Sequence, residues 1–308
     1  MKYHLDPEIA AFVEKSASAY PDNALELSMA EHRECYRALF EMFQAPIPAG
    51  VAKEDSAIPG RSGHSIPVRS YSVETDRPDA LILYLHGGGF IVGNLDSHDS
   101  VCAEIAARTG IRVVAVDYRL APEHLHPAQI EDTQDAFLAL DRGSTIVAGD
   151  SAGGTLSAAL CIAQQDTDRQ PIGQLLIYPY LGGMHLNLEA HVDGFNAPSM
   201  TSSDIEDYID IWSDGNPDWT DPTFAPLIHE KLSGLPPCIA MAAEYDPLRD
   251  DALVYADKLA AAGVKARAIL DKGLPHGHLR ARHLSEKARA SFDRLCEALS
   301  ELAEAGGS

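Results

Sequence analysis

The sequence predicts a doubly wound α/β fold, in which helices cover both faces of a parallel sheet. From about residue 51, short apolar runs rich in Val, Ile and Leu alternate with segments of helical periodicity. Several of these runs are apolar on both faces, which is typical of parallel strands that are covered on both sides. Strands and helices that alternate in this way predict crossover connections between parallel strands.

Each element of the predicted fold can be placed in order along the chain. Apolar runs predict strands at residues 66–71, 80–85, 113–116, 145–148, 174–178, 238–242 and 266–270. Helical periodicity predicts helices at about residues 98–109, 128–140, 152–165, 249–262 and 282–304. Two further helical patterns lie within residues 7–43 and are expected to form an appended helical segment.

One connection is much longer than the others. About sixty residues separate the strand that ends at Tyr178 from the strand that begins near Pro237, and a crossover needs far fewer. This insertion contains a predicted helix at residues 201–212, with Thr201 or Ser202 as its N-cap. We expect it to lie over the carboxyl ends of the strands, where open α/β sheets place their sites.

The predicted domain organisation follows from these segments. Residues 1–45 are expected to be the N-terminal helical part of a cap, and residues 181–219 its inserted part. Residues 46–180 and 220–308 are expected to form the α/β core.

Composition and charge exclude several classes of protein. The chain has 308 residues, 45% of them hydrophobic, and its 46 acidic and 24 basic side chains give a formal net charge of −22. Proteins that bind nucleic acid or anionic membranes concentrate Lys and Arg, so neither partner is expected. The most apolar stretch, residues 81–92, is too short to span a bilayer, and the N-terminus lacks the apolar core of a signal peptide. Membrane insertion is therefore not expected.

The cysteines indicate a reducing compartment. Their number, five, is odd and none is spaced as CxxC, which disfavours a disulfide framework and a zinc site. We expect reduced thiols and a cytoplasmic protein.

The segment GDSAGG at residues 149–154 is the strongest chemical motif. It follows the predicted strand 145–148 and opens the predicted helix 152–165. A G-x-S-x-G motif at a turn between a strand and a helix is typical of a nucleophilic serine. Glycines flank the turn because side chains there would collide with the strand or the helix, and Ser151 is left in a strained conformation. The helix dipole favours negative charge beside Ser151, which predicts a nucleophilic serine.

A glycine-rich loop, HGGGF at residues 86–90, follows the predicted strand 80–85. Three consecutive glycines leave backbone N–H groups uncovered, so a substrate oxygen can approach them as in an oxyanion hole. A flexible glycine turn and a phosphate-binding loop are the simpler interpretations, but a phosphate loop would require a Lys after the glycines. The serine motif favours the oxyanion-hole interpretation, because a nucleophilic serine and an oxyanion hole act together in acyl transfer.

A nucleophilic serine needs a base, and the base needs an acid that orients it. In doubly wound hydrolases the acid and then the histidine follow the serine. Asp246 lies in the turn after the predicted strand 238–242 and is the preferred acid, with Glu244 as the alternative. Asp250 and Asp251 are expected in the first turn of the next helix, where acids stabilise the dipole.

Two histidines that follow the predicted strand 266–270 compete for the role of base, and His276 is preferred to His278. A metal site at His276, His278 and His283 is the alternative. It is disfavoured because residues i and i+2 are poor partners on a helix and no carboxylate stands at HExxH spacing. We therefore expect no metal.

With these residues placed, the chain resembles the hormone-sensitive lipase family of α/β-hydrolases, in its bacterial carboxylesterase branch. The resemblance covers essentially the whole chain. Its motifs are HGGGF at residues 86–90, DYRLAPEH at 117–124, GDSAGG at 149–154, DPTFAPL at 221–227 and DPLRD at 246–250. It implies an α/β-hydrolase fold with an eight-stranded, mostly parallel sheet and a helical cap. One departure is His278, which stands where family members usually have Phe.

The resemblance also implies roles for the site residues. The implied catalytic triad is Ser151, Asp246 and His276. The implied oxyanion hole consists of the amides of Gly88, Gly89 and Ala152, with Gly87 shaping the loop. A homodimer through an edge strand and the C-terminal helix is a further expectation from the family.

The expected activity is hydrolysis of small, neutral, short-chain carboxylic esters through an acyl-enzyme intermediate, without a cofactor. The negative exterior is expected to disfavour polyanionic esters. Candidate residues for the substrate pocket are Phe90, Ile91, Val92, Leu181, Phe195, Tyr208, Trp212 and His278. The alternatives are a peptidase or lactonase with the same triad, and a non-catalytic receptor of the kind that the resembled family includes in the plant gibberellin receptor.

Overall fold

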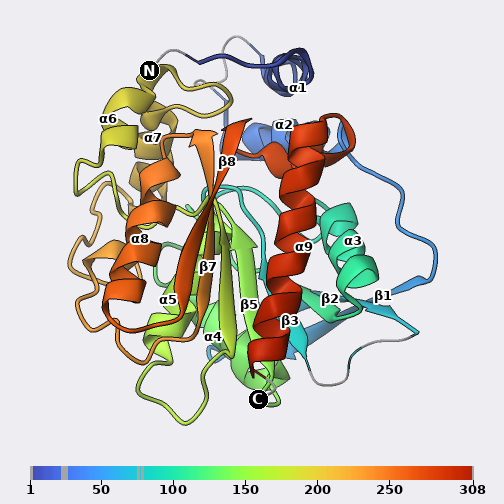
Figure 1. Cartoon of the computed structure of the whole chain (residues 1–308), viewed down its shortest axis with the longest axis vertical. Helices are drawn as coiled ribbons and strands as arrows, with labels where there is room; N and C mark the ends of the chain where they lie inside the picture. The colour runs from blue at the N-terminus through green and yellow to red at the C-terminus, as the bar shows by residue number, and fades with distance from the viewer. Residues whose placement is uncertain (1–2, 22–26, 75–76, 78–79, 307–308) are drawn as a thin grey trace.

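The computed structural model describes residues 3–21, 27–74, 77 and 80–306. Its sheet has eight strands in the order β1-β2-β4-β3-β5-β6-β7-β8 (Figure 1). The strands are β1 Val51–Pro59, β2 Ser65–Val73, β3 Leu81–Leu85, β4 Arg112–Val116, β5 Thr145–Asp150, β6 Gly173–Ile177, β7 Cys238–Tyr245 and β8 Ala266–Pro275. Strand β2 is antiparallel to both β1 and β4, and all other neighbours are parallel. The prediction of an eight-stranded, mostly parallel sheet is confirmed.

The central strands are buried on both faces, which explains why apolar runs located them. Every residue of β5 and β6 is buried, and so is every residue of β3 and β4 after the first. Strand β1 is the strand that no apolar run predicts, because its sequence VAKEDSAIP is polar and mostly exposed. Antiparallel pairing with β2 holds it, from Val51 opposite Val73 to Pro59 opposite Ser65.

Helices cover both faces of the sheet (Figure 1). One face carries α4 (Ala128–Leu140), α5 (Ala152–Ala163) and α8 (Arg249–Ala261), and the other carries α3 (Asp99–Thr109) and α9 (Glu286–Gly306). Apolar side chains of these two groups belong to two separate hydrophobic clusters. Helix α9 begins at Glu286 rather than at residue 282, because residues His278–His283 form a 3-10 helix, η4.

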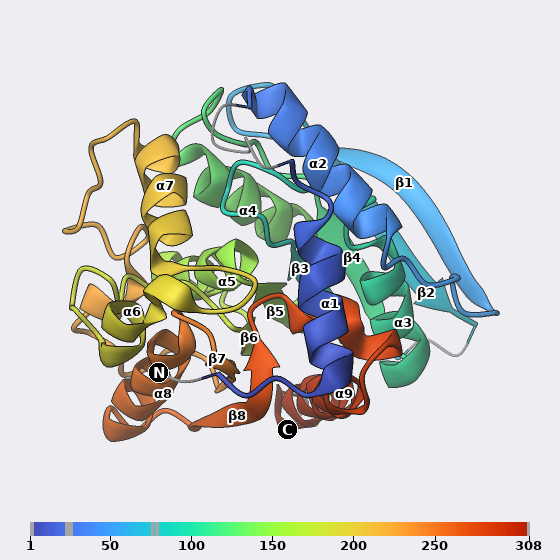
Figure 2. The same ribbon diagram turned by 90° about the horizontal axis from the view of Figure 1, so that it is seen from above.

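Further helices lie over the carboxyl ends of the strands (Figures 1 and 2). They are α1 (Pro7–Ala17) and α2 (Met29–Glu41) from the N-terminal segment, and α6 (Glu189–Asp193) and α7 (Ser202–Ser213) from the insertion. Helix α7 begins as predicted, with Thr201 as its N-cap in a capping box with Asp204.

Both of these helical segments contact the loop that follows β3. The ring of Trp212 on α7 stacks on Phe90 with centroids 3.7 Å apart, and Arg33 on α2 donates a hydrogen bond from Nε to the carbonyl of Ile91 at 3.0 Å. We propose that the two segments form the cap expected at residues 1–45 and 181–219. Residues 1–2 and 22–26 of that range lie outside the described residues.

No helix in the described part of the chain has the length and hydropathy needed to cross a membrane. The five cysteines are free thiols, and four of them are buried. Burial raises the pKa of Cys102 and Cys161 well above its ordinary value, so these two thiols stay protonated and unreactive.

Candidate active site

Ser151 occupies a sharp turn between β5 and α5. Its backbone has φ 54° and ψ −119°, a combination that side chains other than glycine rarely adopt. The turn is this tight because α5 passes close to β3, and a Cβ on Gly153 would overlap with the carbonyl of Leu85. The N–H of Ser151 donates to the carbonyl of Ile177 at 2.8 Å, which anchors the turn to β6. The side chain is left half-exposed at the N-terminus of α5.

The structure brings Ser151, His276 and Asp246 together. The Nε2 atom of His276 lies 3.0 Å from the Oγ of Ser151, and its Nδ1 lies 2.7 Å from the Oδ2 of Asp246. The other oxygen of Asp246 accepts the N–H of Leu248 at 2.9 Å, which fixes the carboxylate. An ionised Asp246 accepts from Nδ1–H, so the neutral ring presents an unprotonated Nε2 to the serine hydroxyl.

The alternative acid and base lie outside this arrangement. Glu244 accepts the N–H of Gly273 at 2.6 Å and so stabilises the end of β8. The ring of His278 is buried, with Nδ1 3.0 Å from the carbonyl of Pro275 and Nε2 3.0 Å from the Oγ of Ser291. Burial lowers the pKa of His278. Its placement in the wall of the substrate pocket is therefore corrected, because both ring nitrogens are occupied inside the core.

The alternative metal site does not assemble either. His283 lies 2.7 Å from the Oε1 of Glu104, away from the partners of His276 and His278. Among the described residues, no group of three or more His, Cys, Asp or Glu side chains is placed to hold a metal ion.

The glycine loop lies beside Ser151 with two free backbone donors. Gly88 has φ 129°, and a Cβ there would overlap with the carbonyl of Val92, so only glycine fits. Within the described residues, no hydrogen bond uses the N–H of Gly88 or Gly89. The N–H of Ala152 is the first of α5 and has no partner within the helix. We propose that these three donors form the expected oxyanion hole.

Gly87 has a different role from Gly88 and Gly89. Its N–H donates to the Oδ1 of Asp150 at 3.1 Å and is not available to a substrate. The same carboxylate accepts from the hydroxyl of Tyr84 at 2.9 Å and lies 3.1 Å from the Nε2 of His98. Burial alone would raise the pKa of Asp150, but His98 and the Tyr84 hydroxyl outweigh it and hold the pKa below its usual range. Asp150 therefore joins the serine turn to the glycine loop as an ionised side chain.

Among the other candidate pocket residues, Tyr208 lies against the glycine loop. A Cβ on Gly89 would lie 2.5 Å from its ring, so Tyr208 covers the glycine loop. Phe90 and Trp212 stack on each other within the core instead. Further candidates that are buried as core residues are Ile91, Val92 and Leu181. Phe195 is 51% exposed on the surface. Their assignment to the substrate pocket stays a prediction.

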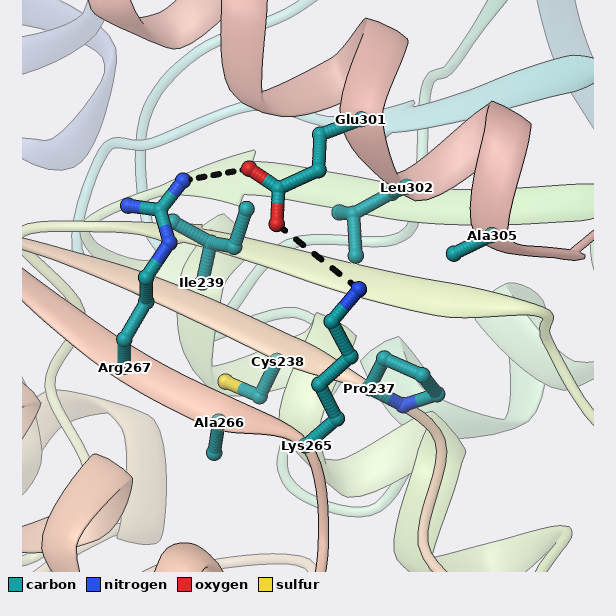
Figure 3. A pocket seen from close by; sticks show the side chains of 9 residues that line it. All are labelled: Pro237, Cys238, Ile239, Lys265, Ala266, Arg267, Glu301, Leu302 and Ala305. Atoms are coloured by element: carbon teal, nitrogen blue, oxygen red, sulfur yellow. Dashed lines mark hydrogen bonds and ion pairs between the residues drawn. The ribbon is translucent and has the colours of Figure 1, made fainter.

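A separate recess of about 50 Å³ lies between the amino ends of β7 and β8 and the end of α9 (Figure 3). Glu301 pairs there with Arg267 at 2.6 Å and with Lys265 at 3.9 Å, as the dashed lines in Figure 3 show. Both cations pair with the same carboxylate, and the recess lies at the end of the sheet opposite Asp246. We therefore assign it no role in catalysis.

A serine held at a strand–helix turn, in contact with a histidine that follows the last strand of this sheet, defines the protein as an α/β-hydrolase. A sequence-family model described as alpha/beta hydrolase fold matches residues 82–280.

Comparison with known proteins gives the same result. An ethyl acetate hydrolase of Pseudomonas putida is 34% identical over 324 residues, which cover 96% of this chain and 99% of the relative. The carboxylesterase NlhH of Mycobacterium tuberculosis is 38% identical over 229 residues, or 70% of this chain and 71% of the relative. A hyperthermophilic esterase from the archaeon Pyrobaculum calidifontis has a similar structure, with TM-score 0.87 at 31% identity over 97% of this chain and 99% of its own. The chain belongs to the hormone-sensitive lipase family of α/β-hydrolases.

Proposed function

We propose that this member of the family is a serine carboxylesterase that cleaves small, short-chain carboxylic esters through an acyl-enzyme formed on Ser151. The observation that carries the proposal is the continuous contact from Asp246 through His276 to Ser151, at 2.7 and 3.0 Å. The names of the similar proteins support an ester as the substrate, since they are an ethyl acetate hydrolase, a carboxylesterase and an esterase.

Each step follows from the positions of these groups. His276 takes the proton of the Ser151 hydroxyl at Nε2 while Oγ attacks the ester carbonyl. The negative charge that develops on the carbonyl oxygen is stabilised by the N–H groups of Gly88, Gly89 and Ala152. As the carbon–oxygen bond breaks, His276 returns its proton to the leaving alcohol. It then takes a proton from water, whose oxygen attacks the acyl carbon. As the bond from that carbon to Ser151 Oγ breaks, His276 returns the proton to Oγ, which frees the acid and the serine.

Asp246 supports both halves of the reaction. Its carboxylate holds the Nδ1–H tautomer of His276 and stabilises the imidazolium that forms in each step. The Asp246 side chain is fully buried, so this interaction operates out of water, where it is stronger.

The preference for short chains rests on two features. Tyr208 covers Gly89, which leaves limited space beside the acyl carbon, and one of the similar proteins is named for a two-carbon acid, ethyl acetate hydrolase. We also propose that the formal charge of −22 disfavours the approach of polyanionic esters.

Two measurements test this function. Replacement Ser151→Ala is expected to abolish the burst of p-nitrophenol from a p-nitrophenyl ester, and substantial residual turnover would exclude Ser151 as the nucleophile. A rate profile from acetyl to dodecanoyl esters is expected to peak at short chains. Matched anilide and lactone substrates decide between the esterase and the peptidase or lactonase alternatives, and a protein that binds these compounds without turnover would be a receptor.

Location and assembly are also proposals. We propose a cytoplasmic protein, because free thiols are typical of reducing compartments, and cell fractionation tests this. We propose a homodimer through the edge strand β8 and helix α9, because β8 has no neighbour on its outer side in this sheet. Light scattering that gives the mass of a monomer would contradict it.

A further inference from the structure

Arg280 places a positive charge beside the catalytic histidine. It lies in η4, and its Nη1 would be 2.7 Å from a Cβ on Gly277, the residue after His276. Its guanidinium lies over two rings of α2, with Cζ 4.9 Å from the Phe40 centroid and 5.5 Å from the Tyr36 centroid. The side chain thus fills the space between the loop that carries the base and the N-terminal helices.

The guanidinium lacks the partners that such a group normally has. Its Nε is completely shut off from solvent and has no hydrogen-bond partner. Within the described residues its one hydrogen bond joins Nη2 to the Tyr36 hydroxyl at 3.3 Å, and no carboxylate pairs with it. By contrast, Arg282 pairs with Glu104 at 2.7 Å and Arg119 with Asp132 at 2.8 Å.

An unpaired guanidinium of this kind is costly, since removing a charge from water must be offset by hydrogen bonds or an opposite charge. The two aromatic rings offset part of this cost. The chain has 46 acidic side chains against 24 basic ones, so carboxylate partners are abundant. The ionised Asp150 acts on Arg280 electrostatically, but within the described residues no carboxylate pairs with it directly, so the cation is available to an incoming anion.

Two further tyrosines interact electrostatically with the same charge. Tyr208 covers Gly89 on the serine side, and burial raises the pKa of Tyr20 and Tyr208 while Arg280 acts on both in the opposite direction. Both tyrosines are therefore neutral at pH 7. Arg280, Tyr20 and Tyr208 are only partly buried, as Ser151 is.

We propose that Arg280, with the Tyr36 hydroxyl, binds a carboxylate on the ester substrate, so that esters carrying one carboxylate are preferred to neutral esters of the same shape. The inference rests on the proposed function, because it assigns a substrate class to the same site. Neutral esters remain substrates, since Arg280 then keeps its contacts with Tyr36 and Phe40.

The test compares esters that differ only in this charge. Monomethyl succinate is matched with neutral methyl 4-oxopentanoate for a carboxylate on the acyl side, and acetoxyacetate is matched with acetoxyacetone for the alcohol side. Wild-type protein is expected to show the higher kcat/KM for the anion of at least one pair, and the pair that responds identifies the side. Loss of a charged hydrogen-bond partner in Arg280→Gln is expected to lower kcat/KM for that anion about 10- to 100-fold, mainly through KM.

Control variants separate binding from folding. Arg280→Lys retains a cation and is expected to recover part of the preference. Arg282→Gln removes the neighbouring arginine that pairs with Glu104, and it is expected to lower thermal stability without changing the anion-to-neutral ratio. If Arg280→Gln lowers the rates of the anionic and neutral esters equally, Arg280 only supports α2 and the proposal is overturned.

A binding measurement tests the proposed anion site separately from the proposed catalytic triad. Calorimetry is expected to detect binding of monomethyl succinate or acetoxyacetate to Ser151→Ala, and its loss in Ser151→Ala/Arg280→Gln. Equal binding to both variants would overturn the anion site while leaving the triad intact. Full turnover by Ser151→Ala would overturn the triad while leaving the anion site intact.

Discussion

The carboxylate of Asp150 accepts the N–H of Gly87 at 3.1 Å, so the residue before the nucleophile also holds the start of the oxyanion loop. Removal of this carboxylate in Asp150→Ala leaves the buried N–H of Gly87 unpaired and frees the loop to shift. We expect kcat for a short neutral ester to fall about 100-fold with little change in KM, because misplaced donors weaken transition-state binding. Tyr84→Phe, which removes one donor to Asp150 but leaves the Gly87 bond, is expected to have a smaller effect. A folded Asp150→Ala protein with wild-type kcat would contradict this role.

A second prediction concerns Gly88. The added Cβ of Gly88→Ala would overlap with the carbonyl of Val92 at a backbone φ of 129°. The loop must then move, and we expect kcat to fall by about two orders of magnitude. Gly143→Ala is the matched control, since Gly143 also has positive φ, at 86°, but nothing lies within 4 Å of its Cβ. The control is expected to lose only about 1 kcal/mol of stability and no activity, and similar kcat values for the two variants would contradict the account.

A third prediction separates the two histidines. His276→Ala removes the side chain that contacts both Ser151 and Asp246, and kcat is expected to fall by at least about 10⁴-fold. His278→Ala removes a buried ring that is bonded to Ser291. It is expected to lower the melting temperature while leaving kcat within about tenfold of wild type. Steady-state kinetics on both folded variants checks this, and the reverse ranking would make His278 the base.

A fourth prediction concerns the pH dependence of stability. Burial lowers the pKa of His86 to about 4, and the nearby His98 adds to the shift. Between this value and the unfolded pKa of about 6.5, the unfolded chain binds a proton that the folded protein does not, so stability falls as pH decreases through this window. His86 is 3% exposed, and its contribution to the fall from pH 7 to pH 4 is expected to be about 3 kcal/mol.

His86→Phe isolates this contribution, because Phe can keep the stacking on Tyr118, whose centroid lies 4.2 Å away, but has no ionisable group. Denaturant unfolding at several pH values is expected to show a shallower loss of stability in the variant below pH 6.5. Parallel curves for the two proteins would show that His86 does not titrate on unfolding.

The parts of the fold that could be predicted are those in which the apolar pattern of the sequence matches the burial of the residues in the folded protein. Strands β3 to β7 have apolar residues on both faces because helices cover both sides, so their sequences identify them. Strand β1 could not be predicted in this way, since VAKEDSAIP has few apolar residues and depends on β2 for its pairing. The predicted start of α9 at residue 282 is too early. Residues 278–283 have the apolar spacing of a helix, but they form a separate 3-10 helix before α9 begins at Glu286.

The candidate site shows the same division. Ser151, Asp246 and His276 could be predicted because chain order and strand ends determine where they lie. The role of Asp150 could not, because its bond joins the last residue of β5 to Gly87 in the loop after β3, and these two segments are far apart in the sequence. Phe90 follows the glycine loop and Trp212 lies on α7, yet their rings stack on each other. This contact depends on how α7 packs against the loop, which the sequence pattern does not indicate.

Covalent labelling is the most direct test of whether Ser151 is the nucleophile. A short-chain p-nitrophenyl phosphonate is incubated with the wild-type protein, and tryptic peptides are analysed by mass spectrometry. We expect one adduct, on peptide 143–169, and no adduct in Ser151→Ala, because His276 activates only that hydroxyl. Equal labelling of Ser151→Ala, or an adduct confined to another peptide, would contradict the assignment of Ser151 as the nucleophile.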